Sequence, residues 1–256
     1  MERRQNILIS LLRSSLYFLG TATTLILIFF PLSLILLALF IPFPIRFQVL
    51  SRWGRFNIWW LGVTCGVRYE VKGLEHIPHD RAAIIYVKHE STWETFAMQK
   101  FFPPHAWILK RTLLLIPFFG WGLASLSPIA INRGSGHKAV QQIVEQGIRK
   151  LNNGQWVMVF PEGTRVPNGS MKKFGIGGAA LAEKSGFPII PVAHNAGAHW
   201  PRGSFIKHPG TIHIVIGEPI VTEGKSASQI NREAETWMRT TMERINGAPI
   251  KELARK

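Results

Sequence analysis

The 256-residue sequence predicts an α/β fold: a mixed, largely parallel sheet flanked by helices and preceded by an N-terminal hydrophobic membrane helix or helical hairpin. Two observations predict it. Residues 16–41 form an almost wholly apolar stretch without a charge. From residue 68 onward, short runs rich in β-branched and aromatic residues alternate with helical patterns, as in layered α/β domains. We therefore expect an anchor and interfacial helix over residues 1–66, and a globular domain over residues 67–256.

The apolar stretch is long enough to cross a membrane. No charged residue occurs between Arg13 and Arg46, and a helix over residues 16–41 would extend about 39 Å at ~1.5 Å per residue. The hydrocarbon core of a bilayer is about 30 Å thick. Arginines flank both ends, so the positive-inside rule gives no orientation. We favour one spanning helix; because Pro31 interrupts the segment, a bent pair of helices that enters and leaves on the cytoplasmic side is the alternative.

Charge and aromatic content also favour a membrane surface. The net charge is +15, which indicates an anionic partner. The basic residues are scattered and no nucleic-acid-binding motif is visible, so we expect membrane lipids and no nucleic acid. Residues 51–64 mix Arg and Trp, as expected at the lipid headgroups or in an ordinary amphipathic core helix. Residues 112–131 are a second charge-free stretch, whose prolines and glycines favour packing in the core or dipping into the bilayer beside the site.

The globular part is predicted to contain six strands and four helices. The strands are expected at residues 68–72, 82–87, 106–110, 156–160, 189–193 and 211–216, and the helices at 92–101, 137–152, 177–185 and 228–245. Ligand sites of such sheets gather at the carboxyl ends of the strands. His89 and Glu162 each follow an expected strand, so we expect the chemistry there.

His89 is the candidate general base, and Glu94 is its candidate partner. Five residues on an ideal helix correspond to about 140°, so the two side chains meet only if His89 precedes a helix and Glu94 lies in its first turns. Ser91 and Thr92 are good N-cap residues for such a helix. The same pattern also matches a capping box, in which Glu94 bonds to the backbone instead. Both roles of Glu94 remain open from the residues alone.

Four blocks in this order resemble the 1-acyl-glycerol-3-phosphate acyltransferase family, whose members carry a His-x4-Asp motif. The blocks are KHESTWE at 88–94, INR at 131–133, FPEGTR at 160–165 and IPVA at 190–193. They span residues 84–195, under half of the chain. Glu94 replaces the usual aspartate, and its extra methylene changes the reach toward His89.

The resemblance implies transfer of a fatty acyl group to the sn-2 hydroxyl of 1-acyl-glycerol-3-phosphate (lysophosphatidic acid), which gives phosphatidic acid. The donor would be acyl-CoA or acyl carrier protein, with no further cofactor and no metal. His89 would take the hydroxyl proton and Glu94 would orient it. We expect the protein at the cytoplasmic face of a bacterial inner membrane. The alternatives are acylation of another lysolipid, such as lyso-ornithine lipid or a lysophospholipid, and a non-catalytic basic protein that binds membrane lipid.

Basic side chains would bind the phosphate of the acceptor. Arg133 and Arg165 resemble the family's phosphate-binding arginines, whose planar forks match phosphate oxygens. Lys110 is a third candidate contact, or alternatively a surface lysine. Glu162 would bind an acceptor hydroxyl, hold Arg165 or form a structural ion pair. The predicted acceptor-binding residues are Lys110, Arg133, Glu162, Gly163, Thr164 and Arg165.

Overall fold

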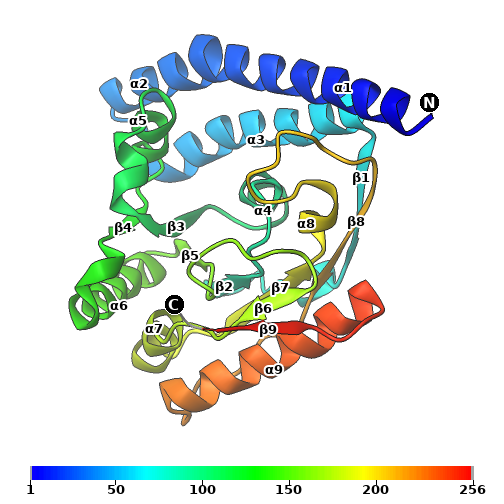
Figure 1. Ribbon diagram of the computed structural model, residues 1–256. Coiled ribbons are helices and arrows are strands. Elements are labelled where there is room, and N and C mark those ends of the chain that lie inside the picture. The colour runs from blue at the N-terminus through cyan, green and yellow to red at the C-terminus, as the bar shows by residue number, and fades with distance from the viewer. Residues whose placement is uncertain (1, 255–256) are drawn as a thin grey trace.

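A seven-stranded sheet forms the centre of the molecule, with the strand order β1-β8-β7-β2-β5-β3-β4 (Figure 1). The computed structural model describes residues 2–254, apart from the side chains of residues 2–6 and 133. The strands are β1 (Val67–Lys72), β2 (Ile84–Val87), β3 (His105–Lys110), β4 (Ile129–Ile131), β5 (Trp156–Val159), β7 (Ile189–His194) and β8 (Gly210–Ile216). Short strands β6 (Ser170–Lys172) and β9 (Lys251–Leu253) pair separately.

The sheet is mixed and largely parallel, as predicted. Strands β2, β3, β4, β5 and β7 run parallel, whereas β8 is antiparallel to β7 and parallel to β1. Every residue of β2, β5 and β7 is buried, which is typical of parallel strands covered on both faces. The carboxyl ends of β2 and β5 therefore lie side by side, and the segments containing His89 and Glu162 begin there.

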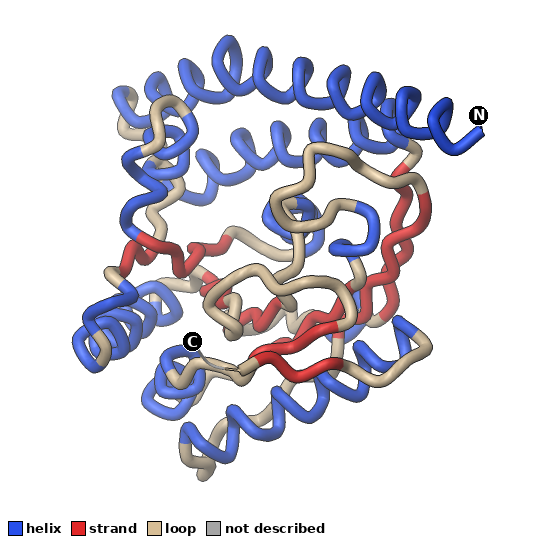
Figure 2. The backbone as a smooth tube through the Cα atoms, viewed as in Figure 1, coloured by secondary structure: helices blue, strands red, loops and turns tan. Residues whose placement is uncertain are grey.

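Helices cover both faces of the sheet. Helices α3 (Phe43–Cys65) and α4 (Trp93–Phe101) lie over one face, and α6 (His137–Asn152), α7 (Gly177–Ser185) and α9 (Ala227–Asn246) over the other (Figures 1 and 2). Along α9, residues spaced by four are all buried, which gives the helix one apolar face: Ile230, Ala234, Met238 and Met242. A short helix α8 (Ala196–His199) follows β7.

The N-terminal segment is a helical hairpin that lies along the domain. Helix α1 (Glu2–Thr24) continues through a π-helical turn, η1 (Leu25–Phe29), into α2 (Phe30–Ala38), so the chain does not reverse at Pro31. Proline is tolerated there because the π-helical turn before it, in which the N–H of Phe30 donates to the carbonyl of Leu25, interrupts the regular hydrogen-bond pattern. The reversal comes at residues 39–42, and α3 then packs against α1. The hydroxyl of Thr21 donates to Asn57 Oδ1 at 2.7 Å across the two helices.

One face of the hairpin is docked and the other is apolar and exposed. The backbone N–H of Lys207 donates to Ser14 Oγ at 3.0 Å, and its ammonium lies over the rings of Tyr17, Trp200 and Phe205. The outward residues of α1 include Leu8, Leu12, Leu16 and Leu19, all exposed. By length and composition, Ile7–Ala38 could cross a membrane.

The second charge-free stretch runs from the surface beside α2 into the sheet. It forms a 3-10 turn, η3 (Arg111–Leu115), then α5 (Phe119–Ala124), and ends in β4. The ring of Phe30 in α2 packs on those of Phe118 and Trp121. Leu115 is 73% exposed and Trp121 is 47% exposed, whereas Leu126, Ile129 and Ile131 are buried, so the stretch begins at the surface and its end packs in the core.

Candidate active site

Glu94 makes the contacts of both roles that the sequence left open. Its Oε1 lies 2.8 Å from His89 Nδ1, and the same oxygen accepts hydrogen bonds from the backbone N–H groups of Glu90 (3.0 Å) and Ser91 (2.9 Å). The loop after β2 makes this possible, because it holds His89 outside α4 while Glu94 lies in the first turn of that helix. The extra methylene of glutamate therefore does not prevent contact with the imidazole.

The electrostatics of Glu94 fix the tautomer of His89. Burial raises the pKa of Glu94, but the hydrogen bond from His89 and the backbone N–H of Ser91 help to outweigh it, so the pKa lies below its usual value. An ionised carboxylate only accepts hydrogen bonds, so Nδ1 of neutral His89 must carry the proton. Nε2 is then the basic nitrogen, as a general base requires.

A buried ion pair anchors the backbone of His89. Lys88 Nζ lies 3.0 and 3.1 Å from the two carboxylate oxygens of Glu162, and both side chains are buried. Glu162 Oε2 also accepts the N–H of His89 at 3.1 Å, and Oε1 accepts the N–H of Lys172 at 3.1 Å. Glu162 therefore pairs with Lys88 rather than with Arg165. Of the roles predicted for Glu162, this geometry corresponds to the structural ion pair and not to contact with the acceptor.

Glu90 is a third buried acid beside this pair. Its Oε1 lies 3.5 Å from Lys88 Nζ, and its Oε2 accepts the N–H of Gly197 at 3.1 Å. Burial raises the pKa of Glu90 to about 8, against the opposing effects of Lys88 and the Gly197 N–H. One lysine thus faces two carboxyl groups in a region without solvent. The side chain of Glu90 also ties α8 to the loop that carries His89.

A neutral histidine supports the loop from behind. His194, at the end of β7, is buried, and its Nε2 lies 2.8 Å from the carbonyl oxygen of Lys88. Its Nδ1 accepts the N–H of Ala196 at 3.2 Å, so Nε2 must be the protonated nitrogen. Burial lowers the pKa of His194, in keeping with a neutral ring. The sequence did not indicate this role, because only the pairing of β7 with β2 brings His194 to Lys88.

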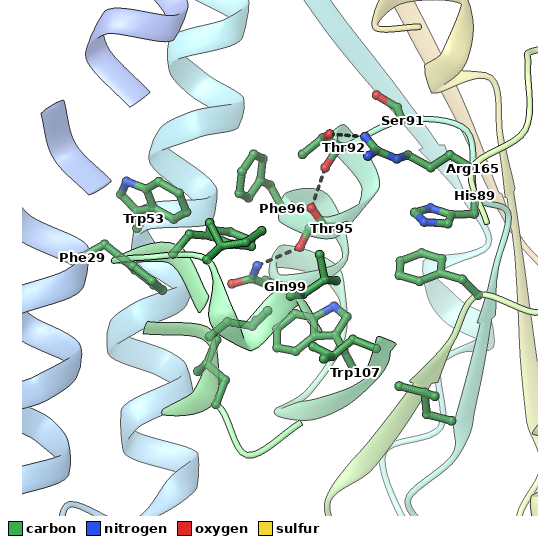
Figure 3. A pocket seen from close by; sticks show the side chains of 18 residues that line it. Phe29, Trp53, His89, Ser91, Thr92, Thr95, Phe96, Gln99, Trp107 and Arg165 are labelled. Carbon is green, nitrogen blue, oxygen red and sulfur yellow. Dashed lines mark hydrogen bonds between the residues drawn. The ribbon is translucent and has the colours of Figure 1, made fainter. Parts of the chain in front are cut away.

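The third block brings Arg165 to His89. Gly163 has a φ of +69°, and its N–H donates to the carbonyl of Phe160 at 2.9 Å, so the block makes a tight turn that favours glycine. The Phe160 ring stacks on the imidazole of His89 with centroids 4.0 Å apart. Arg165 Nη1 donates to Thr92 Oγ1 at 2.9 Å. Figure 3 shows the guanidinium and the imidazole on the same side of the cavity described below.

His89 and Arg165 line one cavity of about 340 Å³. Its hydroxyl groups come from Ser91, Thr92 and Thr95. Most of the remaining wall is apolar and comes from α4, β3 and the stretch after β3. Figure 3 places Phe29 and Trp53 far from His89, and these rings belong to the N-terminal hairpin. The cavity therefore joins a basic, polar end to a long apolar compartment.

Lys110 and Thr164, two further predicted acceptor-binding residues, lie apart from this cavity wall. Lys110 is exposed at the end of β3, and Thr164 is half-buried in the turn beside Arg165. Arg133 begins a 3-10 turn, η4 (Arg133–Ser135), after β4, and its side chain lies outside the described part of the structure. Neither Lys110 nor Thr164 is among the residues that line the cavity.

Comparison with known proteins agrees with this architecture. The Acyltransferase family matches residues 68–195. A 1-acyl-sn-glycerol-3-phosphate acyltransferase of Pseudomonas aeruginosa is 48% identical over 210 residues, which cover 80% of this chain and 81% of that protein. The human 1-acyl-sn-glycerol-3-phosphate acyltransferase beta is 27% identical over 190 residues, covering 72% of this chain and 68% of that protein.

A solved structure extends the similarity over almost the whole chain. It is the crystal structure of the 1-acyl-sn-glycerophosphate (LPA) acyltransferase PlsC from Thermotoga maritima, with a TM-score of 0.77 and 27% identity. The match covers 98% of this chain and 100% of that chain, so it includes the N-terminal hairpin as well as the sheet. The chain therefore belongs to the acyltransferase family and, within it, to the 1-acyl-sn-glycerol-3-phosphate acyltransferases.

Proposed function

We propose that this enzyme transfers a fatty acyl group from a thioester to the sn-2 hydroxyl of 1-acyl-glycerol-3-phosphate, with His89 as the general base. One observation carries the proposal: the His89–Glu94 pair and Arg165 open into the same cavity, and most of the rest of its wall is apolar. A base, a phosphate-binding cation and an apolar compartment are the three requirements of a phosphorylated lipid acceptor.

The reaction needs no covalent enzyme intermediate. As the acceptor oxygen attacks the thioester carbonyl, Nε2 of His89 takes the hydroxyl proton and a C–O bond forms. Glu94 stabilises the imidazolium through the 2.8 Å contact at Nδ1. The tetrahedral intermediate then collapses, the C–S bond breaks, and the imidazolium returns the proton to the departing sulfur. The donor is a thioester of coenzyme A or of acyl carrier protein.

Arg165 is well placed to bind the acceptor phosphate. It is half-buried, and one nitrogen donates to Thr92, which leaves further N–H groups of the guanidinium for phosphate oxygens. The apolar part of the cavity then accommodates a lipid chain between α4 and the hairpin. Lys110 and Arg133 remain candidate contacts at the neighbouring carboxyl ends of β3 and β4.

The hairpin supplies the route to the membrane. The exposed leucines of α1 form an apolar surface, and the same hairpin provides Phe29 and Trp53 to the cavity. Attachment through this surface would bring the apolar end of the cavity next to the lipid layer, where the acceptor resides. The net charge of +15 favours the anionic cytoplasmic face.

The test is an acceptor panel with purified protein and both donor types. Lysophosphatidic acid should be the preferred acceptor, and His89→Ala should abolish transfer, whereas His79→Ala, which changes an exposed histidine, should not. A better rate with lyso-ornithine lipid or a phosphate-free lysolipid would refute the assignment of the acceptor. Equal turnover by His89→Ala would refute the assignment of the base.

A further inference from the structure

A second concave surface, separate from the catalytic cavity, lies beside α4. It is a groove of about 540 Å³ between α3, β1 and α4. Thr92, Thr95 and Gln99 on α4 line the catalytic cavity, whereas Lys100 lines the groove. We call it the α3–β1 groove, and its principal side chains are Arg55, Trp59, Val63, Arg68, Tyr69 and Lys100.

The groove carries three positive charges that the protein does not neutralise. Arg55, Arg68 and Lys100 are exposed, and no carboxylate lines the groove among the described residues. Within residues 2–254 none of the three forms an ion pair with a described carboxylate. Glu70 is the next residue on β1, but its carboxylate lies 3.4 Å from His213. Three like charges in one groove attract an anion.

Aromatic and apolar groups accompany these cations. The ammonium of Lys100 lies 5.0 Å from the centroid of the Tyr69 ring and bonds to its hydroxyl. Trp59 is 59% exposed and Val63, one turn further along α3, is 60% exposed. Tryptophan and arginine together are typical of headgroup depth. A soluble anion would not need this exposed apolar rim.

The location of the groove favours an anion that belongs to the membrane. Helix α3 packs against α1, whose outer face exposes Leu12 and Leu16. Trp59 lines the groove, and the indole N–H of the next residue, Trp60, donates to the carbonyl of Leu16, so a membrane that contacts this face lies close to the groove. We propose that the α3–β1 groove binds the phosphate of an anionic membrane phospholipid, as a site separate from Arg165 and the acceptor. The proposal rests on the membrane attachment in the proposed function.

Vesicle flotation of the full-length protein tests the site. Binding is measured on vesicles of phosphatidylcholine alone and of phosphatidylcholine with phosphatidylglycerol. Phosphatidylglycerol should raise the affinity of the intact protein for the vesicles. In the triple variant Arg55→Gln/Arg68→Gln/Lys100→Gln this gain in affinity should be lost, by about fivefold for each cation removed. The affinity of the variant for phosphatidylcholine alone should not change. The double variant Arg55→Gln/Arg68→Gln retains Lys100 and its contact with Tyr69, so it should lose only part of this gain in affinity.

The matched control removes the same charge from the opposite face of the sheet. Arg149, Lys184 and Arg232 are exposed on α6, α7 and α9, and their triple glutamine variant should keep the full gain. An equal loss in this control, or an unchanged gain in the groove variant, would overturn the site. So would failure of the intact protein to bind either vesicle.

Two further measurements separate the alternatives. Displacement of the intact protein from anionic vesicles by inorganic phosphate or coenzyme A at constant ionic strength would assign the groove to a soluble anion and overturn the lipid source. Acyl transfer to lysophosphatidic acid in detergent micelles is measured in parallel. Its absence with normal vesicle binding contradicts the proposed function alone, and its presence without the phosphatidylglycerol gain contradicts the groove alone.

Discussion

The Oε1 atom of Glu94 lies 2.8 Å from Nδ1 of His89 and accepts two backbone N–H groups of the same loop. One oxygen thus contacts both the imidazole of His89 and the backbone that leads into α4. We predict that Glu94→Gln, which keeps the length and an accepting oxygen, lowers kcat about 10- to 100-fold because the charge opposite the imidazolium is lost. Steady-state kinetics with saturating donor and acceptor measure this loss.

Glu94→Asp shortens the side chain by one methylene and keeps its charge, so it tests the contribution of side-chain length. The shorter side chain cannot make all three contacts from the same backbone position, so both kcat and the melting temperature should fall. The melting temperature of Glu94→Gln should fall less. If the aspartate variant matched the intact enzyme in both quantities, the three contacts of Glu94 Oε1 would contribute neither to catalysis nor to stability.

Arg165 should affect the acceptor more than the donor. Arg165→Ala is expected to raise KM for lysophosphatidic acid, while KM for the thioester changes little, because only the acceptor carries the phosphate assigned to this residue. Thr92→Val removes the hydroxyl that holds the guanidinium at 2.9 Å and should lower kcat/KM by about two- to tenfold. An increase confined to the donor KM would reassign Arg165 to the thioester.

The Lys88–Glu162 pair should contribute to stability in a way that a surface pair does not. Removing Glu162 leaves the buried ammonium of Lys88 with Glu90 alone, at 3.5 Å, so Glu162→Gln should lower the free energy of unfolding by up to about 3–5 kcal/mol. The double variant Lys88→Met/Glu162→Gln should recover part of that loss. Chemical denaturation measures both.

The matched control is the exposed pair Lys225–Glu233, with 2.6 Å between Nζ and Oε2. Glu233→Gln should change the free energy of unfolding by less than about 1 kcal/mol. Similar losses in Glu162→Gln and Glu233→Gln would mean that burial of the Lys88 pair has no energetic consequence.

Glu90 should make the fold more sensitive to alkaline pH. Its pKa is about 8 in the folded protein against an ordinary value of 4.5, so the folded state holds the proton more tightly. The stability that Glu90 contributes is therefore complete below pH 4.5 and is lost as the pH rises toward 8. Melting temperatures of the intact protein and Glu90→Gln, measured across this range, should differ in slope, with the variant flatter. Parallel slopes would contradict the raised pKa.

Much of the fold follows from local patterns. The helix predicted at residues 177–185 is α7 without a change of boundary, because its alanine-rich centre favours a helix and Gly186, in the left-handed region, ends it. The long apolar stretch is helical, as predicted. Whether the helix would continue through Pro31 was not predictable, since the continuation depends on a π-helical turn. Strand β4 escaped prediction because its three residues lie within an apolar stretch that has no strand boundary signal.

The candidate site was predictable in its parts and not in its pairings. His89 and Arg165 were identified from their motifs, and the structure brings them to one cavity. The partner of Glu162 was not predictable, because Lys88 reaches it only through the pairing of β2 with β5, which are separated by almost seventy residues. Local sequence carries no information about which strands are neighbours.

The most direct test of the central claim is the rate of acyl transfer to lysophosphatidic acid by His89→Ala at saturating acceptor and donor. Loss of the general base should lower kcat by about 10² to 10⁴-fold. Vesicle binding should stay close to that of the intact protein, since the His89 side chain does not anchor the hairpin. A variant that folds, binds vesicles and turns over at the rate of the intact enzyme would contradict the account.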